Sequence, residues 1–153
     1  MKRKTSEDVF VNFERIDAGF RPPRLNSLKV KSIFSQLLKK EKLSKAVNVV
    51  FTDNSRIKRL NKLYRYRDIA TDVLSFEYGK DAELLGEIIV SLETAKIQAE
   101  KYGNSFTMET LVLLIHGFYH ILGYKHYRKN DHRAMKKKEQ SAMKFLIKKG
   151  LVR

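Results

Sequence analysis

The sequence predicts an α+β fold, a single domain over residues 1–153 in which a roughly four-stranded mixed sheet packs with about five helices. Three observations lead to this prediction. The chain has 153 residues, close to the size of one ordinary domain. No repeat, low-complexity tract or linker divides it. Segments of strand-like alternation are mixed with longer segments of helical periodicity, an order that favours the α+β class.

The first half of the chain is expected to form two strands and two helices. The spacing of apolar residues predicts, in order, a strand at 9–13, an amphipathic helix over about 26–42, a strand at 47–51 and a helix through Ile57, Leu60, Asn61 and Tyr64. Pro22 and Pro23 break the chain before the first helix. Either Asp53 or Asn54 can cap the second helix.

The second half is expected to add two strands and three helices. In order, these are strands at 73–76 and 87–90, a helix from Ser91 to Gly103, a very apolar helix from Ser105 or Thr107 to Leu122, and a last helix over about 129–149. The very apolar helix should lie at the centre of the core, because nearly all of its faces are apolar. The last helix has one apolar side, formed by Met135, Ala142, Phe145 and Leu146, and one side rich in lysine.

The composition favours a polyanionic partner. Thirty-two Lys and Arg residues against 17 Asp and Glu residues give a formal net charge of +15. Nucleic acid is the commonest polyanion in cytoplasm, although a solvated lysine-rich surface is the alternative. The chain has no cysteine, so any metal must be held by His, Asp or Glu. Neither a signal peptide nor an apolar run of membrane-spanning length is visible, so we expect a soluble cytoplasmic protein without membrane contact.

Three of the four histidines lie close together, in the segment His116-Gly-Phe-Tyr-His120-Ile-Leu-Gly123-Tyr-Lys-His126. His116 and His120 are four residues apart on the predicted central helix, so their imidazoles share one face and can converge on one ion. Gly123 permits a left-handed turn that brings His126 toward the same point. Three nitrogen ligands with one open position are typical of a catalytic zinc site. Nickel, copper or another divalent transition metal is the alternative.

The same histidine spacing occurs in the metzincin peptidases, in which a glutamate general base follows the first histidine. Here that residue is Gly117, and no other carboxylate lies between Ile115 and Asp131. The missing base and the positive charge favour phosphodiester over peptide substrates. A purely structural interpretation, with hydrogen-bonded core histidines, requires all three positions to coincide by chance. The fourth histidine, His132, is expected to be exposed.

Three segments match a known family. The motif H-G-x-x-H-x-x-G-x-x-H stands at 116–126, a second match is LNKLYRYRDIATDVLSF at 60–76, and a third is Gly86-Glu87-Ile88, where the family more often has Gly-Asp-Ile. Met135 and Glu139 fit the start of the family's last helix. On these residues the chain resembles the YbeY endoribonucleases, the ribosomal RNA maturation factors.

The resemblance implies a zinc-dependent endonuclease, a hydrolase that cleaves single-stranded RNA. The implied role is rRNA processing at the 3′ end of small-subunit ribosomal RNA, together with ribosome quality control. The implied partners are ribosomal RNA, the small ribosomal subunit and assembly factors such as the Era GTPase. The family's functional arginine maps onto Arg65, so Arg65 and His116 are the expected catalytic residues. An arginine can clamp a phosphate with two parallel hydrogen bonds. An ion pair of Arg65 with Asp68 or Asp72 is the alternative.

Other residues are further candidates for contacts with the bound RNA. Those expected to bind RNA are Arg65, Arg67, Lys125 and Arg128. Phe118 or Tyr124 could stack on a base, although Phe118 falls within the core pattern. The lysines at 136–138 are expected to form a solvated helix face. Lys125 departs from the acidic residue that the family commonly has there, and a lysine cannot accept a hydrogen bond from an imidazole.

The general base remains unassigned, with Asp72 and Glu87 as candidates by elimination. Two other functions stay open. One is a metzincin-like zinc hydrolase of a non-RNA substrate. The other is a ribosome-assembly binding factor with a structural metal, which three histidine ligands argue against because structural zinc usually has four protein ligands.

Overall fold

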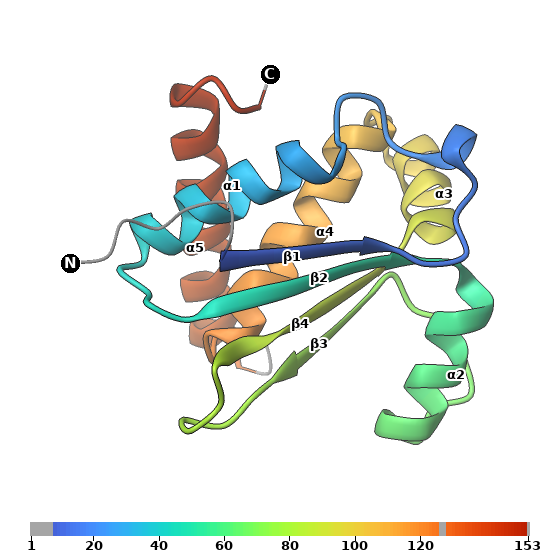
Figure 1. Ribbon diagram of the computed structural model, residues 1–153, viewed down its shortest axis with the longest axis horizontal. Helices are drawn as coiled ribbons and strands as arrows, with labels where there is room; N and C mark the ends of the chain where they lie inside the picture. Colours follow the sequence, from blue (N-terminus) through green and yellow to red (C-terminus); the bar gives the residue numbers. More distant parts are fainter. Residues whose placement is uncertain (1–7, 126–127, 153) are drawn as a thin grey trace.

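A computed structural model describes residues 8–125 and 128–152, which form one sheet with helices on both of its faces (Figure 1). The elements are β1 (Val9–Phe13), η2 (Ala18–Phe20), α1 (Ser27–Lys40), β2 (Ala46–Thr52), α2 (Asn54–Arg65), β3 (Val73–Glu77), β4 (Leu84–Ser91), α3 (Leu92–Tyr102), α4 (Phe106–Ile121) and α5 (Lys129–Lys148). The predicted α+β class, with a four-stranded mixed sheet and five α-helices, is therefore confirmed over these ranges. The short 3-10 turn η2 was not predicted, because three residues are too few to show a periodicity.

The sheet has the strand order β1-β2-β4-β3. β1 pairs with β2 and β2 with β4 in parallel, whereas β3 runs antiparallel to β4. This arrangement makes β3 an edge strand. It also brings the carboxyl ends of β1, β2 and β4 to the same end of the sheet, where α2 and α3 begin (Figure 1).

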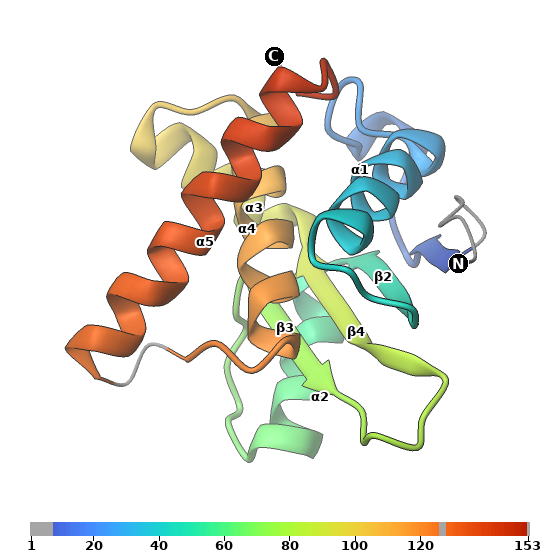
Figure 2. The same cartoon turned by 90° about the vertical axis from the view of Figure 1, so that its left-hand side faces the viewer.

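The helices cover the two faces of the sheet unequally. α1, α3, α4 and α5 lie on one face, and α2 is the described helix on the other (Figures 1 and 2). Among the described residues, no helix is both long enough and apolar enough to cross a membrane.

α4 lies at the centre of the helical layer, as its apolar sequence predicts. Ser105 caps it by accepting a hydrogen bond from the backbone N–H of Met108, so Ser105 rather than Thr107 begins the helix. Phe118 is fully buried and packs edge-to-face on Phe34 of α1. The prediction that Phe118 could stack on a base is therefore wrong, because its helical position points into the core.

At Gly117 the backbone of α4 comes very close to the sheet. A Cβ atom built on Gly117 would lie 2.7 Å from Cγ2 of Ile88 on β4 and 3.1 Å from Oγ of Ser75 on β3. Only glycine lets the helix backbone come this near to the sheet. The contact fixes where the residues beside Gly117 stand above the edge strand.

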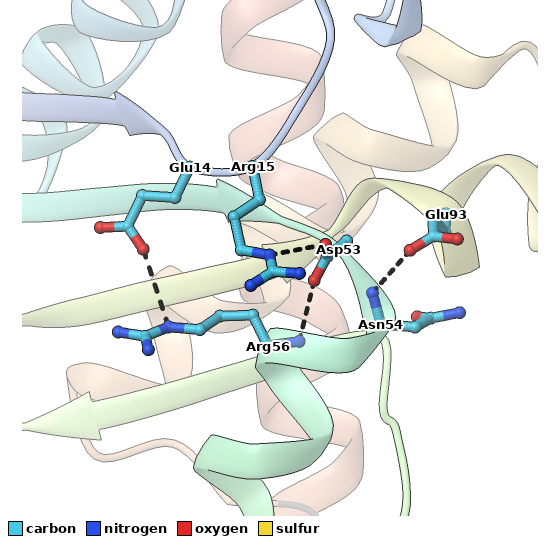
Figure 3. A network of polar contacts seen from close by, with 6 residues as sticks. All are labelled: Glu14, Arg15, Asp53, Asn54, Arg56 and Glu93. Atoms are coloured by element: carbon cyan, nitrogen blue, oxygen red, sulfur yellow. Dashed lines mark hydrogen bonds and ion pairs between the residues drawn. The ribbon is translucent and has the colours of Figure 1, made fainter.

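A polar network joins the start of α2 to the neighbouring loops (Figure 3). Asp53 caps α2 by accepting from the backbone N–H of Arg56 at 2.8 Å, and Arg15 binds the other Asp53 oxygen at 3.0 Å. The N–H of Asn54 donates to Glu93 at the start of α3 over 2.8 Å. Asp53, not Asn54, is thus the cap, and the network anchors the helix that carries Arg65.

Candidate active site

His116 and His120 lie side by side on α4. Their ring centroids are 4.7 Å apart and their planes are inclined by 78°. Both residues are half-buried, so they are neither enclosed in the core nor on a freely solvated face. The predicted sharing of one helix face is confirmed, and two imidazoles at this separation can contribute to one metal centre.

Glu139 of α5 contacts the ring of His116 and orients it. Its Oε1 lies 2.7 Å from Nδ1 of His116, and the two side chains are 25% and 32% exposed. A carboxylate can only accept a hydrogen bond, so Nδ1 carries the proton and donates it. The lone pair of the neutral ring then resides on Nε2. This tautomer and ring orientation are those of metal-binding histidines whose other nitrogen donates to a carboxylate.

The sequence carries a signal for an inward-facing carboxylate at Glu139. Glu139 stands four residues after Met135 and three before Ala142, and both of these residues are buried. It therefore occupies the inward stripe of α5, where a carboxylate needs a partner.

The third expected ligand, His126, lies outside the described residues. No group of three or more His, Cys, Asp or Glu residues that could hold a metal ion is found among the described residues. Gly123 has a φ of +99°, so the predicted left-handed turn after α4 is confirmed. His132 is exposed on α5, as expected.

Lys136 and Lys137 are exposed, as expected, whereas Lys138 is half-buried and pairs with a carboxylate at the end of α1. Its Nζ lies 3.1 and 3.2 Å from the two carboxylate oxygens of Glu41, which also accepts from the hydroxyl of Tyr119 at 3.0 Å. Burial alone would raise the pKa of Glu41, but the bonds from Lys138 and Tyr119 bring it below its ordinary value. The pKa of Tyr119 is raised by burial and by its bond to Glu41, so it stays a neutral donor.

Arg65, the last residue of α2, is anchored on the edge strand. Its Nη2 donates to the backbone oxygen of Ser75 over 2.7 Å, and its guanidinium carbon lies 5.3 Å from the ring centroid of Phe76. The ion pair considered for Arg65 is not what the structure shows. Asp68 instead lies 3.9 Å from Lys62. The Oγ of the same Ser75 lies at the contact with Gly117 of α4, so Arg65 and α4 contact the same residue of the edge strand.

Glu87, one of the two candidates for the general base, does not face α4. Ile88 packs against α4, so the preceding residue, Glu87, points to the opposite face of the sheet. There it accepts hydrogen bonds from Tyr78 at 2.9 Å and from Asn48 at 3.3 Å. Asp72, the other candidate, accepts from the N–H of Val73 at 2.8 Å and from the side-chain amide of Gln98 on α3 at 3.3 Å. Elimination by sequence alone could not separate the two faces of the sheet.

The remaining candidates for binding RNA lie in connections between the helices and strands. Arg67 is exposed in the turn after α2, Lys125 is exposed after α4, and Arg128 is exposed as the residue before α5. Tyr124 is half-buried and packs edge-to-face on Tyr119, with ring centroids 5.8 Å apart. The three cations come from two connections, Arg67 from the one between α2 and β3, and Lys125 and Arg128 from the one between α4 and α5.

A separate groove of about 510 Å³ lies on the α2 side of the sheet. Its walls include Leu60 and Tyr64 of α2, Phe76 of β3, and Glu87 and Ile89 of β4. The sheet separates this groove from α4, so it is not part of the histidine site.

The comparisons with known proteins identify the family. A family model described as Endoribonuclease YbeY matches residues 20–147. The chain belongs to the YbeY family. Relatives named Endoribonuclease YbeY include that of Carboxydothermus hydrogenoformans, 41% identical over 114 residues, which cover 73% of this chain and 80% of the relative. That of Caldanaerobacter subterraneus subsp. tengcongensis is 41% identical over 138 residues, which cover 80% and 87%.

The fold agrees with this membership. The solution structure of TM1509 from Thermotoga maritima matches with a TM-score of 0.60 and 26% identity, over 94% of this chain and 94% of that chain. The resemblance seen in the sequence is thereby confirmed. The YbeY family's name also confirms the expected enzyme class, a nuclease that hydrolyses RNA phosphodiester bonds.

Proposed function

We propose that this YbeY-family chain is a zinc-dependent, single-strand-specific endoribonuclease whose ion is held by His116, His120 and His126. The observation that carries the proposal is the His116–His120 pair with Glu139 on Nδ1 of His116. Together with the family's name, this arrangement favours a metal-assisted nuclease over a structural role for the histidines.

The residues present fit a transition metal. The ring contact brings two imidazoles together, and the Glu139 carboxylate keeps the His116 ring in the tautomer whose Nε2 is the ligand atom. An all-imidazole set suits zinc, with nickel or another divalent transition metal as the alternative. When bound, such an ion supplies a hydroxide near neutral pH or polarises a phosphoryl oxygen.

Arg65 is proposed as the residue that holds the scissile phosphate. A guanidinium has five N–H donors, so a bond to the Ser75 oxygen leaves donors for phosphate oxygens. The anchoring on β3 limits the rotamers of Arg65 and directs the group toward the edge strand beside α4. Charge that develops on the phosphate would then be offset by a group already in place.

Binding of the RNA is proposed to depend on Arg65, Arg67, Lys125 and Arg128. All four residues are exposed, and the whole chain carries a formal charge of +15. Ion pairs between these cations and RNA phosphates make the affinity for RNA fall as the salt concentration rises.

The cellular role follows from the family resemblance. We propose that residues 1–153 act as one catalytic domain in rRNA processing, at the 3′ end of small-subunit ribosomal RNA, and in ribosome quality control. The proposed partners are ribosomal RNA, the small ribosomal subunit and assembly factors such as the Era GTPase, in the cytoplasm.

The test is cleavage of a labelled single-stranded RNA by wild-type protein and by His116→Ala, with metal content measured on both. His132→Ala is the matched control, because it removes an exposed histidine of α5. We expect the wild type and the control to cleave and to hold metal, and His116→Ala to lose both. A duplex of the same sequence should remain intact.

Other outcomes would overturn the proposal in distinguishable ways. Equal cleavage by His116→Ala would indicate a contaminating nuclease. Metal-loaded wild type that binds RNA without cleaving it would indicate an assembly factor. Hydrolysis of a peptide or ester with no RNA binding would indicate the other hydrolase class, although Gly117 has no space for the side chain of a peptidase-type glutamate.

A further inference from the structure

Tyr66 presents its aromatic ring almost entirely to solvent. It is 92% exposed, more than any other large hydrophobic side chain in the described part of the chain. It ends α2 in the left-handed conformation, with a φ of +59°, which a bulky aromatic residue rarely adopts. An exposed aromatic ring in an uncommon backbone conformation points to a role outside the fold's own packing.

The turn that carries Tyr66 is held firmly. The backbone oxygen of Asn61 accepts from the N–H of Tyr66 and from the N–H of Arg67, the latter at 3.3 Å. The side chain of Asn61, which is 4% exposed, donates back to the backbone oxygen of Ile69 over 3.0 Å. Asn61 thus holds the turn through both its backbone oxygen and its buried side-chain amide. The ring of Tyr66 therefore stands on a preorganised backbone, which lowers the entropy lost on binding.

The surroundings of Tyr66 are strongly basic. From residue 58 to residue 68 the chain carries five cations and one carboxylate, that of Asp68. The cations are Lys58, Arg59, Lys62, Arg65 and Arg67. All five are exposed. An aromatic ring between Arg65 and Arg67 combines a stacking surface with phosphate-binding groups, the combination used for single-stranded nucleic acid.

Tyr66 also directly follows the proposed phosphate-binding residue. The adjacent residue, Arg65, donates to Ser75 of β3, and Oγ of Ser75 lies at the Gly117 contact next to His116. A strand of RNA whose phosphate is held by Arg65 would therefore pass close to Tyr66, the next residue of the chain.

We propose that Tyr66 is a base-stacking residue, on which a base of the single-stranded RNA substrate lies next to the phosphate held by Arg65. The inference rests on the proposed function. It adds a reason for the preference for single strands, because a base paired and stacked in a duplex is not available to the ring.

The experiment measures binding of a short fluorescein-labelled single-stranded RNA with 2′-O-methyl riboses, checked for integrity on a gel. Tyr66→Ala should weaken binding about fivefold or more, the factor produced by about 1 kcal/mol of lost stacking. Tyr66→Phe keeps the ring and should bind as the wild type does. Tyr102→Ala is the matched control, because Tyr102 is 61% exposed beside Lys101 at the far end of α3, and it should have no effect.

A second probe separates stacking from charge. An oligonucleotide of the same length that lacks its bases should bind Tyr66→Ala and wild type equally, whereas Arg67→Ala should weaken both probes and reduce the salt dependence. In cleavage assays, Tyr66→Ala should raise KM and leave kcat within about twofold.

The outcomes distinguish this inference from the proposed function. Equal binding of the intact probe by wild type and Tyr66→Ala, with cleavage by both, would overturn the stacking role and leave the nuclease intact. In that case the exposed ring of Tyr66 would either bind a protein partner or have no role in binding. Failure of the wild type to bind or cleave RNA would overturn the proposed function and this inference with it.

Discussion

Lys138 and Glu139 are consecutive residues of α5 that bind two different elements of the fold. Lys138 binds Glu41 at the end of α1, and Glu139 binds His116 on α4. The first contact fixes α5 against α1, and the second uses that fixed position to orient an imidazole. The lysine-rich helix α5 therefore contributes directly to the proposed metal site.

Replacing Glu139 by Gln should lower metal affinity about 10–100-fold, because the charged acceptor on Nδ1 of His116 is lost. Competition with a chromogenic chelator measures the affinity directly. Gln140→Ala, at the next and exposed position, is the control and should bind metal as the wild type does. Unchanged affinity in Glu139→Gln would show that the carboxylate does not orient the histidine.

Replacing Gly117 by Ala should destabilise the protein by about 1–3 kcal/mol, because the new methyl group overlaps Cγ2 of Ile88. The direction of this change in stability is informative, because a Gly→Ala replacement within an ordinary helix would add about 1 kcal/mol to the free energy of unfolding. Urea unfolding measures the difference, and Gly79→Ala, where a Cβ meets nothing within 4 Å, is the control. The cost of Gly117→Ala should be smaller when Ile88 is also Ala; an equal cost would place the strain elsewhere.

The elements were predictable because each is encoded locally. The apolar run of α4 and its cap at Ser105 are visible within a few residues of sequence, and so is the turn at Gly123. β4 begins at Leu84, earlier than predicted, because Leu84 and Leu85 continue a pattern that the polar residues before them obscure.

Contacts between distant segments were not predictable in the same way. The bond of Glu139 to His116 spans 23 positions and depends on how α5 crosses α4. The anchoring of Arg65 depends on β3 being the edge strand, which follows from strand order rather than from any local pattern. Sequence could therefore propose that Arg65 is functional, but not which backbone oxygen holds it.

Arg65→Ala should reduce RNA cleavage by about 100-fold or more while leaving bound metal unchanged, because a phosphate clamp is lost and the histidines are not touched. The hydrogen bond to Ser75 is also lost, at a cost of about 1 kcal/mol. Arg65→Lys should remain impaired, since an ammonium cannot form two parallel bonds. Cleavage rates, metal content and unfolding are compared across these variants, and loss of metal in Arg65→Ala would sink the clamp assignment.

Stability at acid pH should depend on Glu41. Burial would raise its pKa, but the bonds from Lys138 and Tyr119 hold the folded-state pKa below the ordinary value of 4.5. A carboxyl group whose pKa is lowered by folding stabilises the protein above its unfolded-state pKa, and this contribution is lost as the pH falls through the folded-state value. Glu41→Gln should therefore be less stable than wild type by about 1–3 kcal/mol near neutral pH, and the gap should narrow below about pH 4. Urea unfolding of both proteins at a series of pH values measures the gap. A gap that stays constant down to the acid transition would mean that the Lys138–Glu41 contact contributes nothing through charge, and that α5 is held against α1 by packing alone.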